Sequence, residues 1–191
     1  PLAFADAGFE QMLRTALGKM DGEALTDADL PAIKALTALR GEKCGIASLE
    51  DIKLLEGLET LSLKSVSIRD LTPLQNLDKL TSLTLEDCHL QDISPIKYLT
   101  GLTELNLREN KIREIDALKD MTALTSLNLS RNTVGDVSHL LNLSALKHLD
   151  LSDNKLSSDL RTLTALTALE TLDLSQNNGI TDVSALSEMH W

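Results

Sequence analysis

A repeat of about 22 residues runs through most of the chain and restricts what it can fold into. Six segments share the pattern leucine-x-x-leucine-x-leucine, followed three positions later by asparagine, cysteine or, once, valine. They begin at Leu58, Leu80, Leu102, Leu124, Leu146 and Leu169. A weaker seventh copy begins at Leu36, with Gly41 where the third leucine is expected. Self-similarity at a fixed period of this length indicates an array of stacked units.

The leucines within each unit follow the periodicity of a β-strand. Leu61 and Leu63 flank Ser62, so the two leucines point to one face and the serine to the other. One unit cannot bury its leucines alone, so successive strands must stack into a parallel sheet with a shared aliphatic interior. Aromatic residues make up only 2% of the chain, which agrees with a thin, layered leucine core.

The second half of each unit places apolar residues every three positions, as at Ile93, Ile96 and Leu99. This spacing suits short 3₁₀ turns, which also accept Pro73 and Pro95. The sequence therefore predicts an α/β solenoid of the leucine-rich-repeat class. We expect a right-handed superhelix with a parallel sheet on its concave face and 3₁₀ turns or short helices on its convex face.

One position after each strand is expected to satisfy the backbone of the following turn, because buried amides need partners. Asparagine serves this purpose well, a thiol donates weakly, and valine cannot donate at all. We therefore expect the turn at Val66 to be hydrated or distorted. The residues at this position are Cys44, Val66, Cys88, Asn110, Asn132, Asn154 and Asn177.

The two cysteines lie two units apart, which places their backbones roughly 10 Å from each other at the usual strand spacing. A disulfide needs Cα atoms closer than about 7 Å. We expect two free, buried thiols, and no metal or redox site because the chain has no CxxC motif.

Residues 1–35 do not follow the repeat. Phe9, Met12 and Leu13 share one face of a predicted helix that Gly18 ends, and Thr26 with Asp29 forms a capping box before a second helix. The expected organisation is a helical N-terminal cap over residues 1–35 and seven repeats over residues 36–191. An eighth strand would begin at Trp191, so we expect no C-terminal cap and a chain that is part of a longer protein.

The 22-residue repeats, the convex motifs "DLTP" and "DISP", and a cap reading "FADAGFEQMLRTALGK" then "LTDADLPAIKAL" resemble internalin-like leucine-rich-repeat domains of Gram-positive bacteria. The resemblance covers essentially the whole chain. It implies an exported domain, attached to the cell surface, that binds host or other proteins on its concave face. The concave aromatic residues that some members use are missing here, so the resemblance supports a general binding role.

Charge and motifs restrict the partner. The net charge of -11 disfavours nucleic acid and anionic membranes, which attract basic surfaces. No apolar run approaches the roughly 18 residues of a membrane span. No phosphate loop, nucleophile elbow or zinc-binding motif occurs, so we expect a protein that is not an enzyme and needs no cofactor or metal. We also expect a monomer.

The outward positions of the strands form the candidate binding surface. Only Arg108 and Arg131 belong to the residue types that dominate binding hot spots, and His148 near Asp150 is expected to be an ordinary surface histidine. The candidate residues are Lys64, Glu86, Glu104, Asn106, Arg108, Asn128, Arg131, His148, Asp150 and Asp173.

Three functions are compatible with this pattern. The first is a protein-binding recognition or adhesion module, located outside the cell or on the surface of a Gram-positive bacterium. The second is a cytoplasmic scaffold or regulator, which the free cysteines favour because reducing compartments preserve thiols. The third is a structural spacer for another domain.

Overall fold

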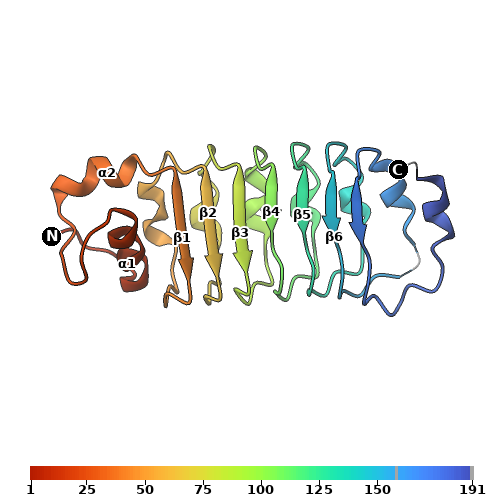
Figure 1. The fold of residues 1–191 in the computed structure, drawn as a ribbon, viewed down its shortest axis with the longest axis horizontal. Helices are drawn as coiled ribbons and strands as arrows, with labels where there is room; N and C mark the ends of the chain where they lie inside the picture. Colours follow the sequence, from red (N-terminus) through yellow and green to blue (C-terminus); the bar gives the residue numbers. More distant parts are fainter. Residues whose placement is uncertain (158, 190–191) are drawn as a thin grey trace.

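A computed structural model describes residues 1–157 and 159–189. The chain forms an elongated stack in which each unit adds one strand to a single parallel sheet (Figure 1). The sheet runs in the order β1-β2-β3-β4-β5-β6-β7. This confirms the predicted leucine-rich-repeat solenoid, whereas the strand expected to begin at Trp191 lies outside the described residues. The strands are β1 Ala38–Glu42, β2 Thr60–Lys64, β3 Ser82–Glu86, β4 Glu104–Asn106, β5 Ser126–Asn128, β6 His148–Asp150 and β7 Thr171–Asp173.

The leucines of neighbouring strands meet in register. Leu61 pairs with Leu83, and Leu83 pairs with Leu105, so the same position recurs along the whole stack. All three side chains are buried, and they belong to one apolar core that extends from the N-terminal helix to the seventh repeat. At about 1.5–3 kcal/mol per fully buried aliphatic side chain, this column is the main source of stability.

The strands shorten from five residues in β1–β3 to three in β4–β7. In the shorter strands an outward asparagine or aspartate binds the amide two residues further on. The Oδ1 atom of Asn106, for example, accepts a hydrogen bond of 3.0 Å from the Arg108 amide. Such a side chain competes with the strand ladder for that amide and ends the strand. Ser62 and Thr84 hold the same position in β2 and β3, where the strands continue.

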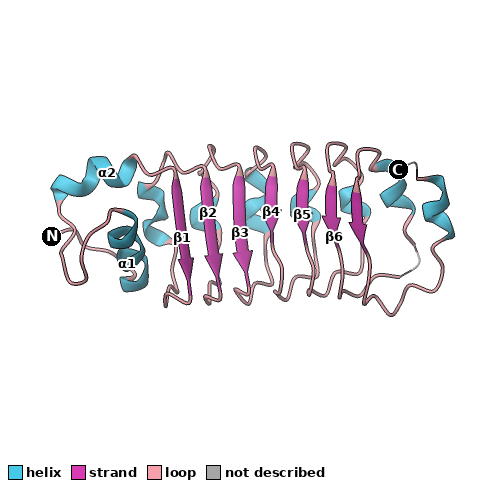
Figure 2. Ribbon diagram, in the orientation of Figure 1, coloured by secondary structure: helices cyan, strands magenta, loops and turns pink. Residues whose placement is uncertain are grey.

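The opposite face of the sheet carries short 3₁₀ segments, as predicted from the three-residue spacing (Figure 2). Pro73 and Pro95 lie in the first turns of two of them. The segments are η2 Glu50–Leu54, η3 Thr72–Leu74, η4 Ser94–Tyr98, η5 Asp116–Leu118, η6 Ser138–Leu140, η7 Arg161–Ala165 and η8 Ser184–Glu188.

The recurring aspartates of the convex motifs begin these segments. Asp92 accepts a hydrogen bond of 2.8 Å from the amide of Ser94 at the start of η4. Hydrogen bonds from the hydroxyl and amide of Ser94 hold the pKa of Asp92 below its usual value. Asp70 and Asp136 bind the corresponding amides in the same way. The "DLTP" and "DISP" motifs are therefore caps, and they set where the chain turns back toward the sheet.

Two helices, α1 (Ala7–Ala16) and α2 (Leu30–Lys34), precede the sheet. Asp6 caps α1 by accepting from the Phe9 amide at 2.8 Å, and its other oxygen accepts from the amides of Ala47 and Ser48 at 3.0 Å each. Burial alone would raise the pKa of Asp6, but these backbone hydrogen bonds together lower it. One carboxylate therefore starts the helix and attaches it to the first repeat.

Gly41 explains why the first repeat departs from the leucine pattern. A Cβ atom at this position would lie 2.2 Å from Sδ of Met12 and 2.8 Å from Sγ of Cys44. Met12 comes from the buried face of α1 and fills the space that a leucine occupies in the other units. The missing leucine is therefore the point at which the N-terminal helix packs against the sheet.

Both cysteines are free, as predicted, but only Cys88 is fully buried. Burial raises the pKa of Cys88 to about 11, so its thiol stays protonated at neutral pH. The prediction of a buried Cys44 was wrong, since this residue is half-buried. Cys44 belongs to the first repeat, which has no repeat before it. Helix α1 packs there instead, around Gly8, and it covers less of Cys44 than a repeat would.

Gly41→Ala should lower the free energy of unfolding by about 1–3 kcal/mol, because the added methyl group overpacks the contact with Met12. Urea denaturation measures this change. Gly101→Ala is the matched control, with its nearest new contact at 3.8 Å, and should stay within about 0.5 kcal/mol of the wild type. In a Met12→Ala background the cost of Gly41→Ala should fall, although the contact with Sγ of Cys44 at 2.8 Å would keep it above the control. An unchanged cost there would show that the contact with Met12 is not the cause.

Candidate functional site: the outward face of the sheet

The inward leucines leave every second strand residue on the outward face of the sheet, which we call the sheet face. All ten candidate residues are exposed or half-buried there. Eight of them lie within the strands, whereas Arg108 lies two residues after the end of β4 and Arg131 lies in the turn after β5. The structure therefore places the candidates on one surface, and it divides them into three local groups.

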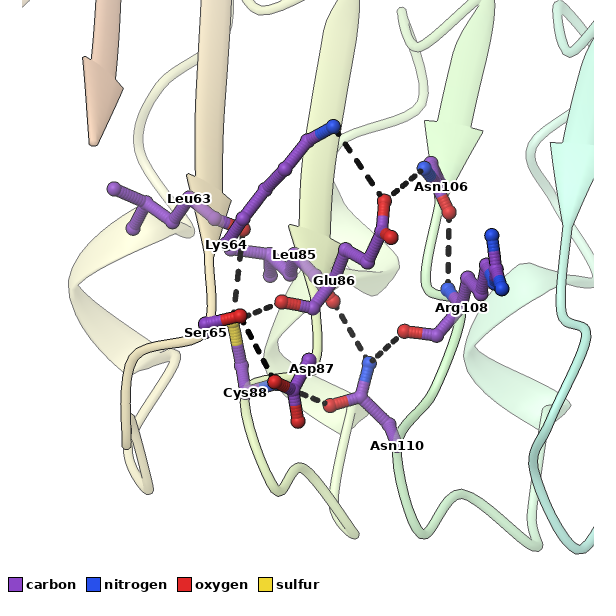
Figure 3. A network of polar contacts seen from close by, with 10 residues as sticks. All are labelled: Leu63, Lys64, Ser65, Leu85, Glu86, Asp87, Cys88, Asn106, Arg108 and Asn110. Carbon is purple, nitrogen blue, oxygen red and sulfur yellow. Dashed lines mark hydrogen bonds and ion pairs between the residues drawn. The ribbon is translucent and has the colours of Figure 1, made fainter. Parts of the chain in front are cut away.

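The first group joins β2, β3 and β4 (Figure 3). Nζ of Lys64 lies 3.6 Å from Oε2 of Glu86, and Nδ2 of Asn106 donates to the same oxygen at 3.2 Å. Glu86 therefore receives partners from both neighbouring strands. In β4, Glu104 accepts a longer hydrogen bond of 3.4 Å from the hydroxyl of Ser82. Lys64 therefore compensates the charge of Glu86, whereas the partner of Glu104 is a neutral hydroxyl.

The second group contains both arginines. Arg108 and Arg131 line a hollow of about 430 Å³ together with three serines, Gln176 and the two carboxylates Asp150 and Asp153. Arg131 lies 3.5 Å from Glu109, whereas Arg108 has no ion pair within residues 1–157 and 159–189. Small serine side chains beside a cation leave room for a group from outside. The sequence singled out both arginines, but only the structure shows that they face one hollow.

The third group occupies β5, β6 and β7, around a hollow of about 330 Å³. Nδ1 of His148 lies 2.9 Å from Oγ1 of Thr171. Asp150 accepts from the amide and hydroxyl of Ser152 at 2.9 and 2.7 Å.

The remaining two candidates of this group also bind their own turns. Asn128 accepts from the amide of Ser130 at 2.9 Å, and Asp173 accepts from the amide of Ser175 at 2.9 Å. Hydrogen bonds from the hydroxyl and amide of Ser175 lower the pKa of Asp173. Across the described residues, no three His, Cys, Asp or Glu side chains gather as metal ligands would. These carboxylates and amides therefore serve mainly to end strands.

Sequence reasoning missed the backbone conformation at the rim of the sheet face. One residue per unit, two positions after the last leucine of the strand, has a left-handed φ between 50° and 60° although none is glycine. These residues are Lys43, Ser65, Asp87, Glu109, Arg131, Asp153 and Gln176. Such a conformation is uncommon for residues with a Cβ atom. The only available signal was weak, because no β-branched residue occupies the position.

Hydrogen bonds between units hold this conformation in place. The amide of Glu109 donates to the carbonyl of Ser130 at 2.9 Å, and the amide of Arg131 donates to that of Ser152 at 2.9 Å. The side chain of Arg131 therefore projects from a backbone position that the neighbouring unit fixes.

The predicted asparagine ladder lies directly beneath these turns. Nδ2 of Asn132 donates to the carbonyls of Leu107 and Leu129 at 2.9 and 3.0 Å, and its Oδ1 accepts from the Ile112 amide at 3.0 Å. Each asparagine therefore bonds its own turn and also the preceding unit. Val66 lacks this capacity, yet Ser65 beside it keeps the same left-handed turn and its bond to Glu86 at 2.9 Å. Of the two alternatives expected at Val66, distortion is therefore absent, and hydration stays a prediction.

Asn132→Ala should destabilise the protein by about 1–3 kcal/mol, because it leaves the buried amide of Ile112 without its acceptor. The carbonyls of Leu107 and Leu129 each keep one donor, from Asn110 and Asn154. Urea denaturation gives the loss, and amide hydrogen exchange at Ile112 should accelerate. Asn142→Ala, on the exposed convex side, should change stability by less than about 0.5 kcal/mol. Equal effects of the two substitutions would contradict a structural role for the ladder.

Two families of leucine-rich repeats match parts of the chain. The family described as "Leucine rich repeat" matches residues 79–134, and that described as "Leucine Rich repeats (2 copies)" matches residues 144–188. No curated protein matches the chain. None of the helices among the described residues is long and apolar enough to cross a membrane.

Several solved structures share the whole architecture. An internalin, InlF from Listeria monocytogenes, is 34% identical with a TM-score of 0.88, and the match covers 97% of this chain and 54% of that one. Internalin C2 from the same species is 31% identical with a TM-score of 0.77, covering 98% and 91%. A leucine-rich-repeat protein of Leptospira interrogans is 22% identical with a TM-score of 0.71, covering 83% and 47%, and shares the fold.

Proposed function

Because the chain belongs to the internalin-like leucine-rich-repeat proteins of bacteria, we propose that it is a non-catalytic module that binds another protein on its sheet face. Leucine-rich-repeat domains are typically protein-interaction modules, and a solenoid of this kind offers a wide open sheet for a partner. The chain spans about half the length of the InlF chain that it matches, so the role of the whole protein is part of this proposal.

The hollow between Arg108 and Arg131 is the observation that carries the proposal. Arginine is enriched in binding hot spots because its planar guanidinium pairs with carboxylates in two parallel hydrogen bonds. Arg108 has no carboxylate partner within the described part of the chain, and the serines beside it leave space for one. An acidic side chain of the partner would therefore meet a cation that needs no rearrangement to receive it.

The other side chains of the sheet face fit recognition better than catalysis. Asp150 and Asp173 are held by the amides of their own turns, and Glu86 is held between Lys64 and Asn106. No carboxylate of this group is left as a free general base.

A plant hormone receptor solved in complex with RGF2 has the same fold at 24% identity and a TM-score of 0.64, covering 74% of this chain and 24% of that one.

The proposed location is the surface of a Gram-positive bacterium or the medium around it, and the proposed state is a monomer. Family membership supports an exported role, whereas the free thiols Cys44 and Cys88 would suit a cytoplasmic scaffold. Antibody labelling of intact cells, together with fractionation, distinguishes the two. A pool confined to the cytosol would reject the surface role in favour of the scaffold.

Arg108→Glu together with Arg131→Glu should weaken partner binding by about thirtyfold or more, since a hot-spot residue contributes about 2 kcal/mol or more. Immobilised wild-type protein first isolates the partner from extracts and culture fluids, and the affinity of the purified partner is then measured. Arg161→Glu with Lys119→Glu is the control, because it changes the charge equally on the convex side. Unchanged affinity in the sheet-face variant would favour the spacer function instead.

A further inference from the structure

The asparagine ladder begins only at Asn110, so the rungs between the first three repeats lack an asparagine, and the one between the second and third repeats is filled by a cysteine. In an intact rung, Oδ1 of Asn110 accepts from the amide of Cys88 in the preceding unit at 3.0 Å (Figure 3). The same oxygen accepts from the amide of Leu90, also at 3.0 Å. Cys88 holds the corresponding position one unit earlier, where the corresponding amides are those of Val66 and Ile68. Its thiol lies 3.6 Å from the carbonyl of Leu63 and 3.3 Å from that of Glu86, so it replaces the donor half of an asparagine.

The acceptor half of this rung is missing. Sulfur is a weak acceptor, and the thiol faces the amide of Val66. The amide of Ile68, which corresponds to that of Leu90, has no acceptor among the described residues, although Ile68 is only 1% exposed. Buried backbone amides are almost always paired, so an orphan amide needs an explanation.

A second bond between the same two units is also missing. In the following units the next turn closes onto the preceding one, with the Lys111 amide donating to Leu90 at 2.8 Å and the Thr133 amide to Ile112 at 2.9 Å. Among the described residues, the equivalent hydrogen bond from the His89 amide to the Ile68 carbonyl is absent. His89 instead has a φ of 58°, a left-handed value that the corresponding Lys111 and Thr133 do not share. The two turns therefore stand apart at this point.

A hollow of about 540 Å³ occupies this gap. The buried residues Ile68 and Cys88 line it, and Arg69, His89 and Lys111 surround them. Neither Arg69 nor Lys111 has an ion pair among the described residues. The only carboxylate lining the hollow is that of Asp92, which already accepts from the Ser94 amide at the start of η4. In a chain of net charge -11, cations are thus concentrated beside an unpaired amide.

We propose that this hollow binds a tetrahedral oxyanion, such as sulfate or a phosphate group. Oxyanions carry several acceptor oxygens and negative charge, and proteins bind them with backbone amides together with arginine and lysine. Ile68, Arg69 and Lys111 all line this one hollow, so an unpaired amide, a guanidinium and an ammonium group occur together at its wall. It lies in the turns beyond the strand ends, so it does not depend on the proposed function of the sheet face.

Titration of the ¹⁵N-labelled protein with sodium sulfate or sodium phosphate, at constant ionic strength, tests the site. We expect saturable shifts of the Ile68 and His89 amide signals. Arg69→Ala with Lys111→Ala should weaken binding about tenfold or more, because charged hydrogen bonds dominate such affinity. Lys119→Ala with Arg161→Ala removes the same two charges elsewhere and should leave the affinity unchanged.

A second variant tests the broken rung itself. Cys88→Asn supplies the acceptor that asparagine supplies in the four units that follow, so it should occupy the Ile68 amide. We expect it to weaken oxyanion binding about tenfold while Arg69 and Lys111 remain, and to raise the urea midpoint. A phosphate monoester in place of the free ion shows whether an esterified group can enter. If it binds as phosphate does, the site accepts a group carried by a larger molecule, and if only the ions bind, it takes free ions.

Unsaturable shifts in the wild type would overturn the proposal. So would wild-type affinity in the Arg69→Ala, Lys111→Ala variant, which alters only exposed side chains and should fold normally. Wild-type affinity in a folded Cys88→Asn variant would show that the orphan amide takes no part.

Discussion

Leucines that meet in register across neighbouring units are the interaction on which everything else in this protein depends. No unit buries its own apolar side chains, so each strand is stable only when a neighbouring unit covers its leucines. The register is strict because a shift of one residue would exchange the buried and exposed faces of a strand. This constraint has a functional consequence. Every second side chain of a strand points outward, and the outward side chains of successive strands form straight columns across the sheet.

Backbone polar groups set the second constraint, and the repeats meet it in different ways. Asn110, Asn132, Asn154 and Asn177 bond their own turns and the preceding unit, which joins the later repeats through side chains as well as strands. The earlier repeats carry Cys44, Val66 and Cys88 at that position, and they have longer strands instead. The change from one solution to the other falls between the third and fourth repeats, and the hollow lined by Ile68, His89 and Lys111 lies directly beside it.

The same division appears on the sheet face. Lys64, Glu86 and Asn106 satisfy one another in the earlier strands, whereas Asn128, Asp150 and Asp173 use their oxygens to end the later strands. Arg108 lies between these two regions without an ion pair in the described chain. A recognition surface needs groups that are held in place and still available, and this arginine meets both conditions because its backbone is fixed by Asn106.

The sequence alone determined the stack, its register, the ladder asparagines and the outward position of all ten candidate residues, because these follow from the spacing of leucines along one chain. Tertiary structure decided what depends on a neighbouring unit. Gly41 makes room for Met12 of the helical cap, Arg131 projects from a left-handed turn, and the missing acceptor at Cys88 matters only to Ile68 in the unit before. Such contacts join residues about one repeat apart or more, and a periodic pattern, which describes what all units share, says nothing about where one unit differs from the next.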